Sequence, residues 1–333
     1  MKLYIKSTAC VSPLEITQTD ETFEFSIPEH TAANNLQVIN PNYKELLSLN
    51  SIRRISKFNK IGVFAALKCV ENFTVPLDGI IVGTGIGGFG NTEKFLLDMD
   101  ESLEKNLSPN PFFQSLHSSL SGNIAIATKC DAYNTTYVNK GTSFESAVLD
   151  SMMMIQEHPT QHILIGAADE ITDDYTKIAN RINYFQKEKL PILGEGAAFL
   201  VVSGIKTDHE ACISGMKTLF MASVAEINEH IQQLLKENKI TVNAIDILVS
   251  GDETITANLT EINTAFAEIP SIHYKQYVGE YPTSSAFAVW FSEKIIATQH
   301  IPKVCKQKRI ENIQTILIVN QYLKNTSIIL ISK

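Results

Sequence analysis

The sequence predicts an α/β protein in which helices cover the sheets, assembled from two similar halves. Strand-like and helix-like segments alternate along nearly the whole chain, which is typical of sheets covered by helices. Each half also finishes with adjacent strands, and this repeated order of elements suggests an internal pseudo-twofold. We expect a first half over residues 1–205 and a second half over 206–333.

The composition excludes several classes of protein. The chain has 333 residues, of which 44% are apolar, so it can bury a large core. A net charge of −8, with only one short basic cluster at 303–309, argues against nucleic acid or an anionic membrane as partner. The five cysteines are odd in number and form no CxxC pair, which indicates neither a disulfide framework nor a zinc site. Without an export signal or an apolar run near the ~18 residues of a span, we expect a cytoplasmic protein with no anchor.

The elements of the first half follow from periodicity, β-branched runs and turn residues. We expect strands at 2–10, 78–83, 134–138, 161–167 and 194–203, and helices at 61–70, 92–99, 112–128 and from 142 onward. The helix at 112–128 contains Gly122 and many small residues, so it should pack closely against a neighbour. The polar segments 20–50 and 171–190 are expected to be loop or surface cover.

The second half repeats this pattern. Its predicted strands are 211–215, 244–250, 271–274, 313–320 and 326–332, and its predicted helices are 222–238, 255–268 and 283–298.

A glycine run follows the strand at 78–83. Gly83, Gly85 and Gly88 fit the GxGxxG pattern of dinucleotide sites in a strand-to-helix context. The acidic residue expected about 20 residues further on should end a second strand, whereas Glu101 and Glu104 lie in a polar stretch. We therefore interpret the glycines as residues that allow a tight turn.

The segment 133–155 is predicted to be a strand that passes through a sharp elbow into a helix. The change of period falls at 140–142, and Thr142 with Glu145 fits a capping box. Gly141 is then the elbow residue. A cysteine just before a helix N-terminus would be held as a reactive thiolate by free N–H groups and the helix dipole. A glycine there either supplies a special backbone conformation or marks a lost nucleophile.

Five landmarks occur in an order and spacing that identify a family. They are Val11-Ser12-Pro13, Gly83–Gly88, Asn134-Thr135-Thr136, Gly166–Glu170 and Gly194–Ala198. With these landmarks the chain resembles the β-ketoacyl synthases of the thiolase fold over nearly its whole length. The resemblance implies a thiolase-like fold, layered αβαβα, with two pseudo-symmetric halves.

The same resemblance locates the family's Cys-His-His triad, and none of the three residues is intact. The cysteine position is Gly141, because Asn134-Thr135-Thr136 aligns with the approach to the elbow. The first histidine position is Ser250, since Glu261 follows eleven residues later. The second is Glu280, five residues after Lys275, and Lys275 matches the family's lysine. The family's glycine-rich gating loop is replaced by residues 320–325, which are shorter and bulkier.

No other group is expected to replace the cysteine. We expect Thr142 to be used in capping, Ser143 to lie at the helix start and Cys130 to lie on the wrong side of the strand. A serine nucleophile needs an adjacent base, and no sequence motif places one of the six histidines considered beside a serine. These are His117, His158, His162, His209, His230 and His273.

A ketosynthase fold without its nucleophile resembles the chain-length factors of polyketide systems, including those of aryl polyene and flexirubin-type clusters. The resemblance implies a non-catalytic subunit with no cofactor or metal, which pairs with a catalytic ketosynthase and meets an acyl carrier protein. A heterodimer or homodimer is expected. Two alternatives stay open: an enzyme of altered chemistry (acyl transfer, decarboxylation or hydrolysis) that uses Ser250, Lys275 or Glu280, and a self-associating scaffold for carrier proteins.

Overall fold

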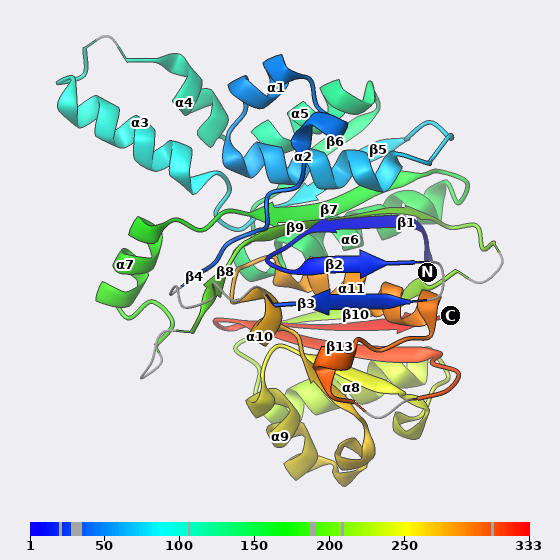
Figure 1. Cartoon of the computed structure of the whole chain (residues 1–333). Coiled ribbons are helices and arrows are strands. Elements are labelled where there is room, and N and C mark those ends of the chain that lie inside the picture. Colours follow the sequence, from blue (N-terminus) through cyan, green and yellow to red (C-terminus); the bar gives the residue numbers. More distant parts are fainter. Residues whose placement is uncertain (20–21, 28–34, 106, 187–190, 208–209, 308–309) are drawn as a thin grey trace.

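The computed structural model describes residues 1–19, 22–27, 35–105, 107–186, 191–207, 210–307 and 310–333. Ten strands form a continuous mixed sheet that runs through the molecule, with helices packed along it (Figure 1). The α/β class predicted from the sequence is confirmed.

The first half contributes five strands of this sheet. They are β1 (Leu3–Val11), β5 (Gly79–Gly83), β6 (Tyr133–Tyr137), β7 (Ile163–Asp169) and β9 (Gly196–Ser203). Their spatial order is β6-β5-β7-β9-β1, in which β5 is parallel to both β6 and β7, and β9 is antiparallel to both β7 and β1.

The second half repeats the same order with the same orientations. Its strands are β10 (Cys212–Phe220), β11 (Ile247–Ser250), β12 (Ser271–His273), β13 (Thr315–Tyr322) and β14 (Asn325–Ser332). They lie as β12-β11-β13-β14-β10, and β10 joins the halves by pairing antiparallel with β1. The topology thus contains the internal repeat that the sequence suggested. The division at residue 205 falls between β9 and β10 and stays a prediction.

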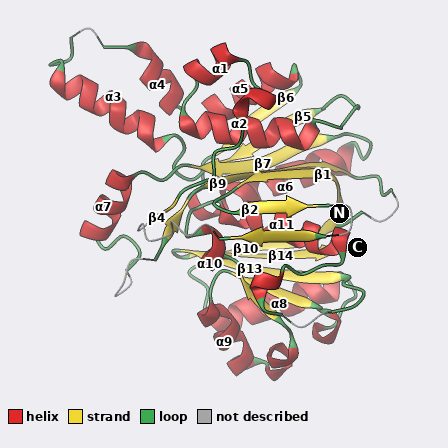
Figure 2. Cartoon of the chain, in the orientation of Figure 1, coloured by secondary structure: helices red, strands yellow, loops and turns green. Residues whose placement is uncertain are grey.

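Five layers result from the way the helices cover these strands. The longer helices are α2 (Lys57–Val70), α3 (Phe89–Glu101), α5 (Ser119–Thr128), α6 (Ser143–Glu157), α8 (Val224–Glu237), α9 (Glu253–Ile262) and α11 (Ser284–Thr298). Helices α2 and α5 pack on the outer face of the first half's strands, and α8 and α9 pack on the outer face of the second half's. Helices α6 and α11 lie between the two sets of strands (Figures 1 and 2).

Burial on both faces explains why the central strands read as nearly continuous apolar runs. All residues of β7 and β9 are buried, as expected for strands covered on both sides. Helix α11 is buried from Ser284 to Ser292, so it shows no amphipathic stripe.

Two predictions about the first half are corrected. The segment 20–50 is not only surface cover, because β3 (Phe23–Ser26) pairs with β2 (Glu15–Gln18) and buries Phe23 and Phe25. The ring of Phe23 lies 5.4 Å from that of Trp290, edge to face. Apolar residues at alternate positions of a short strand therefore supply part of the core over α11. Residues 20–21 and 28–34 of this segment lie outside the described residues.

The predicted helix at 112–128 is two helices, α4 (Pro109–Ser115) and α5. Gly122 has nothing within 4 Å of an added Cβ, so it does not mediate close packing. The close contact comes from the facing helix instead, where a Cβ on Gly62 would lie 2.6 Å from Leu120.

The remaining elements are short. They are β4 (Asn35–Leu36), β8 (Leu193–Gly194), α1 (Leu49–Arg54), α7 (Asp173–Arg181), α10 (Lys275–Val278) and the 3-10 turns Tyr43–Glu45, Lys140–Thr142, Val242–Ala244, Thr264–Glu268 and Lys303–Cys305. In Figure 1, α3 and α4 project together away from the layered body. No helix in the described ranges is long and apolar enough to cross a membrane.

Candidate functional site: the elbow and the clefts beside it

Gly141 lies buried in the turn between β6 and α6, as predicted for the elbow. A Cβ on Gly141 would lie 2.7 Å from Cβ of Tyr322 and 2.9 Å from its Cδ1, far inside van der Waals contact. The residue with positive φ in this turn is Lys140, at 50°, and not Gly141. Glycine is therefore required here by the approach of Tyr322, not by an unusual backbone conformation.

Tyr322 fills the space over the elbow. It ends β13, is only 1% exposed and packs edge to face on Phe185, with ring centroids 5.9 Å apart. Ile171 and Leu193 belong to the same apolar cluster. Burial raises the pKa of the Tyr322 phenol, so the side chain is neutral at physiological pH. We call Tyr322 and Phe185 the elbow plug.

The hydroxyl groups at the elbow are engaged in the backbone of the turn. Ser143 Oγ lies 2.9 Å from the carbonyl oxygen of Thr84 and 2.8 Å from that of Lys140, and it accepts a hydrogen bond from the Asn139 N–H. Thr142 Oγ1 donates to the Asn139 carbonyl at 3.1 Å. These contacts hold the turn against β5 and leave neither hydroxyl beside a base.

The predicted capping box is wrong. Thr142 is the N-cap residue of α6 but its side chain accepts no backbone N–H. Glu145 is 1% exposed, and its carboxyl faces the hydroxyls of Ser285 and Ser327 in the core instead of the N-cap backbone. Helix α6 is a central helix, so the first-turn glutamate is turned into the core, where burial raises its pKa.

The glycine run after β5 wraps around a buried carboxylate. Asp169 Oδ1 accepts hydrogen bonds from the N–H groups of Gly85 and Ile86 at 2.8 and 2.9 Å and from the Thr84 hydroxyl at 2.9 Å. Its Oδ2 accepts from the N–H and hydroxyl of Thr283, at the start of α11. The amides that a phosphate would need are thus used internally, and Asp169 ties the glycine turn to the second half.

Ser250 is hydrogen-bonded to a histidine, which the sequence analysis missed. The parallel pairing of β11 with β12 places Ser250 opposite His273, and Ser250 Oγ lies 2.7 Å from His273 Nδ1. Ser250 is fully buried, and its hydroxyl also lies 3.1 Å from the Asp252 carbonyl. No sequence motif indicated this pair, because neighbouring parallel strands bring together residues that no local motif connects.

Lys275 and Glu280 form a nearly buried ion pair. Lys275 Nζ lies 2.7 Å from Glu280 Oε1, with the two side chains 9% and 10% exposed. The ammonium also donates to the carbonyl of Gln321 at 2.6 Å, next to Tyr322 in the chain. A Gly279 φ of 78° allows the tight turn between the two partners. The Glu280 carboxylate is therefore neutralised from within the chain.

The four predicted site residues fall into two groups. His273, Lys275 and Glu280 line one cleft of about 240 Å³ together with Gly251, and Ser250 lies beneath it. Gly141 does not line this cleft, and Tyr322 packs directly against it. The side chain at residue 141 therefore offers no nucleophile, and the charged groups of the cleft belong to a separate site.

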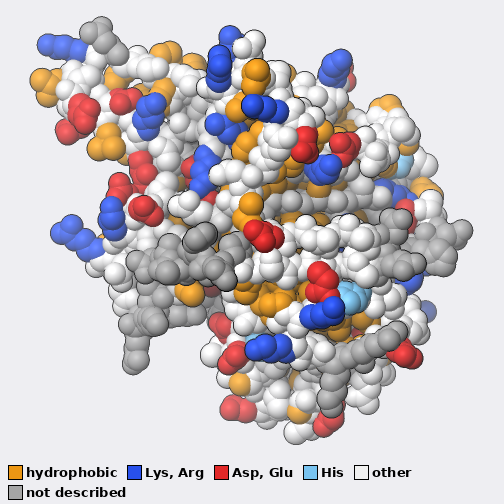
Figure 3. All heavy atoms as spheres, viewed as in Figure 1, with side chains coloured by type: hydrophobic (Ala, Val, Ile, Leu, Met, Phe, Trp, Pro, Cys, Tyr) orange, Lys and Arg blue, Asp and Glu red, His pale blue; other side chains and the backbone are white. Residues whose placement is uncertain are grey.

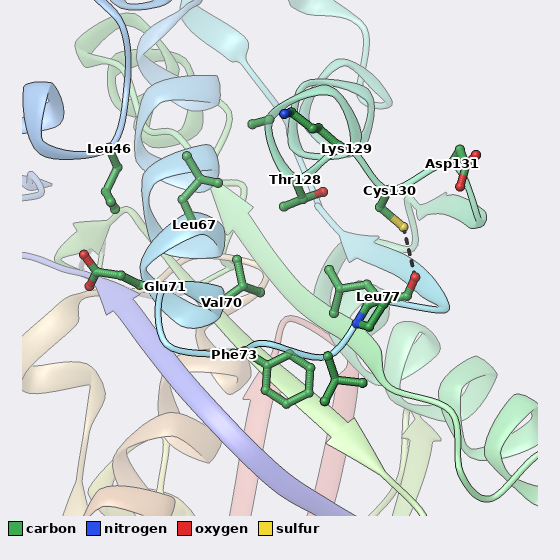
Figure 4. Close-up of a pocket in the computed structure, with 13 residues that line it drawn as sticks. Leu46, Leu67, Val70, Glu71, Phe73, Leu77, Thr128, Lys129, Cys130 and Asp131 are labelled. Carbon is green, nitrogen blue, oxygen red and sulfur yellow. Dashed lines mark hydrogen bonds between the residues drawn. The ribbon is translucent and has the colours of Figure 1, made fainter.

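Cys130 is remote from the elbow. It lines a pocket of about 510 Å³ beside Leu67, Val70 and Leu77, and its thiol donates to the Leu77 carbonyl at 3.5 Å (Figure 4). Leu77 precedes β5, whereas Lys140 and Thr84 lie beyond the carboxyl ends of β6 and β5. Cys130 and Gly141 thus lie near opposite ends of the same strands, as expected from the sequence.

Two further histidines make local contacts. His162 packs at a tilt against Phe73 with ring centroids 5.2 Å apart, and His230 contacts the Glu226 carbonyl within its own helix. His209 lies outside the described residues.

Comparison with protein families identifies the family to which this chain belongs. The family profile described as "Beta-ketoacyl synthase, N-terminal domain" matches residues 29–258, more than half of the chain. The chain belongs to the β-ketoacyl synthase family. No curated protein matches it in sequence.

Solved structures of ketosynthases share its fold. The ishigamide ketosynthase/chain length factor superposes with a TM-score of 0.75 at 14% identity, over 100% of this chain and 99% of that one. A ketosynthase in complex with its chain length factor from Xenorhabdus doucetiae (ApeO and ApeC) gives 0.69 at 12% identity, over 99% and 97%. The AntDE ketosynthase complex with its acyl carrier protein AntF gives 0.73 at 14%, over 99% of each chain. The thiolase-like ketosynthase fold expected from the sequence is confirmed.

Proposed function

We propose that this β-ketoacyl synthase homologue is a non-catalytic subunit that pairs with a catalytic ketosynthase, as a chain-length factor does. The observation that carries the proposal is the elbow plug: Tyr322 occupies the space into which a side chain at residue 141 would project. In this proposal Gly141, Ser250 and Glu280 stand at the family's cysteine and histidine positions, and Lys275 at its lysine position.

The kinds of protein that share the fold support this assignment. Two of the similar structures contain chain-length factors, and one of these is the ApeC subunit bound to its ketosynthase ApeO. We infer a role in extending a polyene or polyketide chain, with the catalytic cysteine supplied by the partner.

A pairing surface lies beside the elbow. Strand β6 is at one end of the described sheet and pairs only with β5, so its other edge has free N–H and carbonyl groups. Tyr133 on β6 is 44% exposed, and Leu149 and Met153 on α6 are 54% and 61% exposed. An open strand edge flanked by apolar side chains fits a ketosynthase subunit that extends the sheet, in the large apolar class of obligate interfaces above about 2,000 Å².

A second surface suits an acyl carrier protein. A groove of about 630 Å³ is lined by Arg53, Arg54 and Ile126, the last of which is 80% exposed. Helix α1 ends at Arg54, and both arginines are exposed. Guanidinium groups beside an exposed apolar residue are suited to the acidic, phosphorylated surface of a carrier protein.

The test is co-expression with a ketosynthase that has an intact Cys-His-His set, preferably one encoded beside this gene. We expect the two chains to co-purify, with a light-scattering mass equal to the sum of one copy of each. A monomer in isolation and in the presence of every candidate ketosynthase would overturn the proposal.

One observation favours a second function, thioester hydrolysis. Ser250 Oγ and His273 Nδ1 are within hydrogen-bond distance, as in a nucleophile and base pair. Ser250 is 0% exposed, however, so a substrate cannot reach its hydroxyl in this conformation. We expect no hydrolysis of acyl-carrier protein by the purified chain. A rate above the uncatalysed one that His273→Ala abolishes would establish the hydrolase function instead.

A further inference from the structure

The free edge of β6 has polar side chains on both faces. Thr136 donates to the hydroxyl of Ser121 at 2.8 Å, and Asn134 donates to the Ser121 carbonyl at 3.1 Å, so these two side chains face α5. The alternate residues Tyr133 and Tyr137 face α6, because successive side chains of a strand point to opposite sides. A strand that is polar on both faces specifies the register of an added strand only weakly. Pairing at this edge therefore needs another source of specificity.

A carboxylate is fixed beside this edge. The Tyr133 hydroxyl donates to Asp150 Oδ2 at 3.0 Å, which joins α6 to the first residue of the strand. Burial and the nearby charge of Asp150 raise the pKa of Tyr137 to about 12. Both phenols therefore stay protonated at physiological pH, and they stabilise the carboxylate as neutral hydrogen-bond donors.

The charge of Asp150 is not balanced within the described chain, since no described lysine, arginine or histidine forms an ion pair with it. Its surface neighbours on α6 are apolar, because Leu149 and Met153 are 54% and 61% exposed. An interface that covers these side chains also removes water from the carboxylate. A desolvated carboxylate is costly unless a cation pairs with it, and two phenol hydroxyls fill only part of its hydrogen-bonding capacity.

Selection of the partner is expected to depend on local contacts. Acidic and basic side chains of the described residues are interspersed on the face shown in Figure 3, so that face has no broad field of one sign. The cation that suits the β6 edge best is an arginine, because its guanidinium group can donate two parallel hydrogen bonds to a carboxylate and stack on an aromatic ring. Asp150 and the 44% exposed Tyr133 offer both contacts.

A second copy of this chain is poorly suited to the same edge. Residues 133–157 contain no arginine. Lys140, their single basic residue, follows the end of β6 that lies away from Tyr133. Two copies paired about a twofold axis would also bury two Asp150 carboxylates. The charge at this edge therefore favours a different protein over a second copy.

We propose that Asp150 is the specificity anchor of the β6 edge, and that the ketosynthase partner places an arginine against it. Tyr133 is a positioning residue, since its hydroxyl holds the carboxylate at the edge. This inference rests on the proposed pairing through β6 and α6, and it adds the chemical feature that an accepted ketosynthase must carry. A ketosynthase without that arginine is rejected, because it would leave a buried carboxylate unpaired.

The test is pairing of the full chain with the ketosynthase encoded beside its gene, measured as a dissociation constant by sedimentation. Asp150→Asn keeps the shape of the side chain and removes its charge, and it should weaken pairing by about thirtyfold or more. Asp174→Asn on α7 is the matched control, since Asp174 is 57% exposed and pairs locally with Lys177. The control should leave the dissociation constant unchanged.

A double-mutant cycle tests the positioning role of Tyr133. Tyr133→Phe alone should weaken pairing by about fivefold, as for one lost hydrogen bond. In the Asp150→Asn background the same change should have almost no further effect, because the charge that Tyr133 positions is already gone.

Charge reversal identifies the partner residue. Asp150→Arg should abolish pairing with the unmodified ketosynthase, because it opposes two cations at a covered site. One arginine-to-aspartate variant of the ketosynthase should restore pairing with Asp150→Arg. Equal melting temperatures of the isolated chains would show that all variants fold.

Three results would overturn the inference and leave the proposed pairing intact: unchanged pairing in Asp150→Asn, equal loss in Asp174→Asn, or no arginine variant that rescues Asp150→Arg. Failure of the unmodified chain to pair with any ketosynthase would overturn both. A stable dimer of this chain alone that Lys140→Gln dissociates would assign the cation to a second copy, and would also overturn the inference.

Discussion

At the scale of single residues, the glycine at the elbow and the tyrosine above it are matched in size. Gly141 leaves a space at the elbow, and Tyr322 fills it, so that restoring a side chain at residue 141 would bring two atoms to within 2.7 Å. A thiolate at the elbow would be stabilised by the helix dipole. The elbow plug, however, leaves no space for the side chain and blocks access to it. In the proposed function, inactivity therefore rests on the packing of the core as well as on the absence of a cysteine at residue 141.

Gly141→Ala should lower the free energy of unfolding by about 1–3 kcal/mol, because overpacking forces Tyr322 or the turn to move. Gly122→Ala is the matched control, since nothing lies within 4 Å of the added methyl group, and it should be neutral or stabilising by up to about 1 kcal/mol. Denaturant unfolding measures both. Equal effects at the two glycines would contradict the close contact at the elbow.

Gly141→Cys should resist iodoacetamide in the native protein and react only when Tyr322 is also replaced by alanine. The physical reason is steric, since the thiol would lie beneath a side chain that is 1% exposed. Mass spectrometry of the iodoacetamide-treated protein measures the extent of alkylation. Rapid alkylation of the single variant would show that Tyr322 moves aside readily.

The ion pair at Lys275 gives a third prediction at this scale. Lys275→Met should destabilise the fold by about 3–5 kcal/mol, because it leaves the nearly buried Glu280 carboxylate without a partner. Adding Glu280→Leu should recover a large part of that loss. A double-mutant cycle in urea tests this, and a coupling energy near zero would mean that solvent already screens the pair.

At the scale of elements, a buried carboxyl connects α3 to the body of the protein. Burial, reinforced by the charge of Glu195, raises the pKa of Glu170 to about 7. Lys57 is already paired with Glu195 at 2.5 Å, and Glu93 on α3 adds a further negative charge nearby. Helix α3 buries no residue of its own, and its N-terminal part is held by Phe89 against Tyr175 and by the hydrogen bond from Thr172 to Glu93.

The carboxyl of Glu170 makes the free energy of unfolding depend on pH. Between about 4.5 and about 7 the native protein holds a proton on Glu170 that the unfolded chain releases, so the free energy of unfolding falls as pH rises through this window. The expected loss attributable to Glu170 is about 3 kcal/mol. Glu170→Gln should flatten the profile, while Glu229→Gln on the exposed face of α8 should leave it unchanged. Urea titrations from pH 5 to pH 8 provide the measurement, and an unchanged slope in Glu170→Gln would refute the assignment.

The edge at β6 and α6 leads to a prediction about pairing. Leu149→Lys with Met153→Lys should abolish co-purification with the ketosynthase and leave the melting temperature of the isolated chain within about 2 °C, because both side chains are exposed. Ile178→Lys is the control, since Ile178 is 52% exposed on α7. Equal loss of pairing in the control would place the interface elsewhere.

Most elements could be predicted from the sequence because they depend on local periodicity, and the elbow was located to the residue by the change of period at 140–142. The contacts that define the site could not be predicted from the sequence. Tyr322 over Gly141, His273 beside Ser250 and Asp169 beneath the glycine turn all join residues far apart in the chain, and only the packing of the layers sets their distances. The capping box failed for the same reason, since tertiary burial of Glu145 overrode a local pattern.

At the scale of the whole molecule, the two halves have the same strand order. Each half places a helix in the central layer, and Asp169 joins the glycine turn to the start of α11, while Ser143 joins the elbow to Thr84. The proposed role uses the surfaces of this layered body while the elbow stays closed by Tyr322.

The central claim is that this chain carries no acyl group while its partner does. The most direct test is intact-mass spectrometry of both subunits after the co-purified complex is incubated with an acyl-carrier protein. We predict one acyl adduct on the ketosynthase subunit and none on this chain. An acyl adduct on this chain, mapped to residues 139–145, would contradict the account.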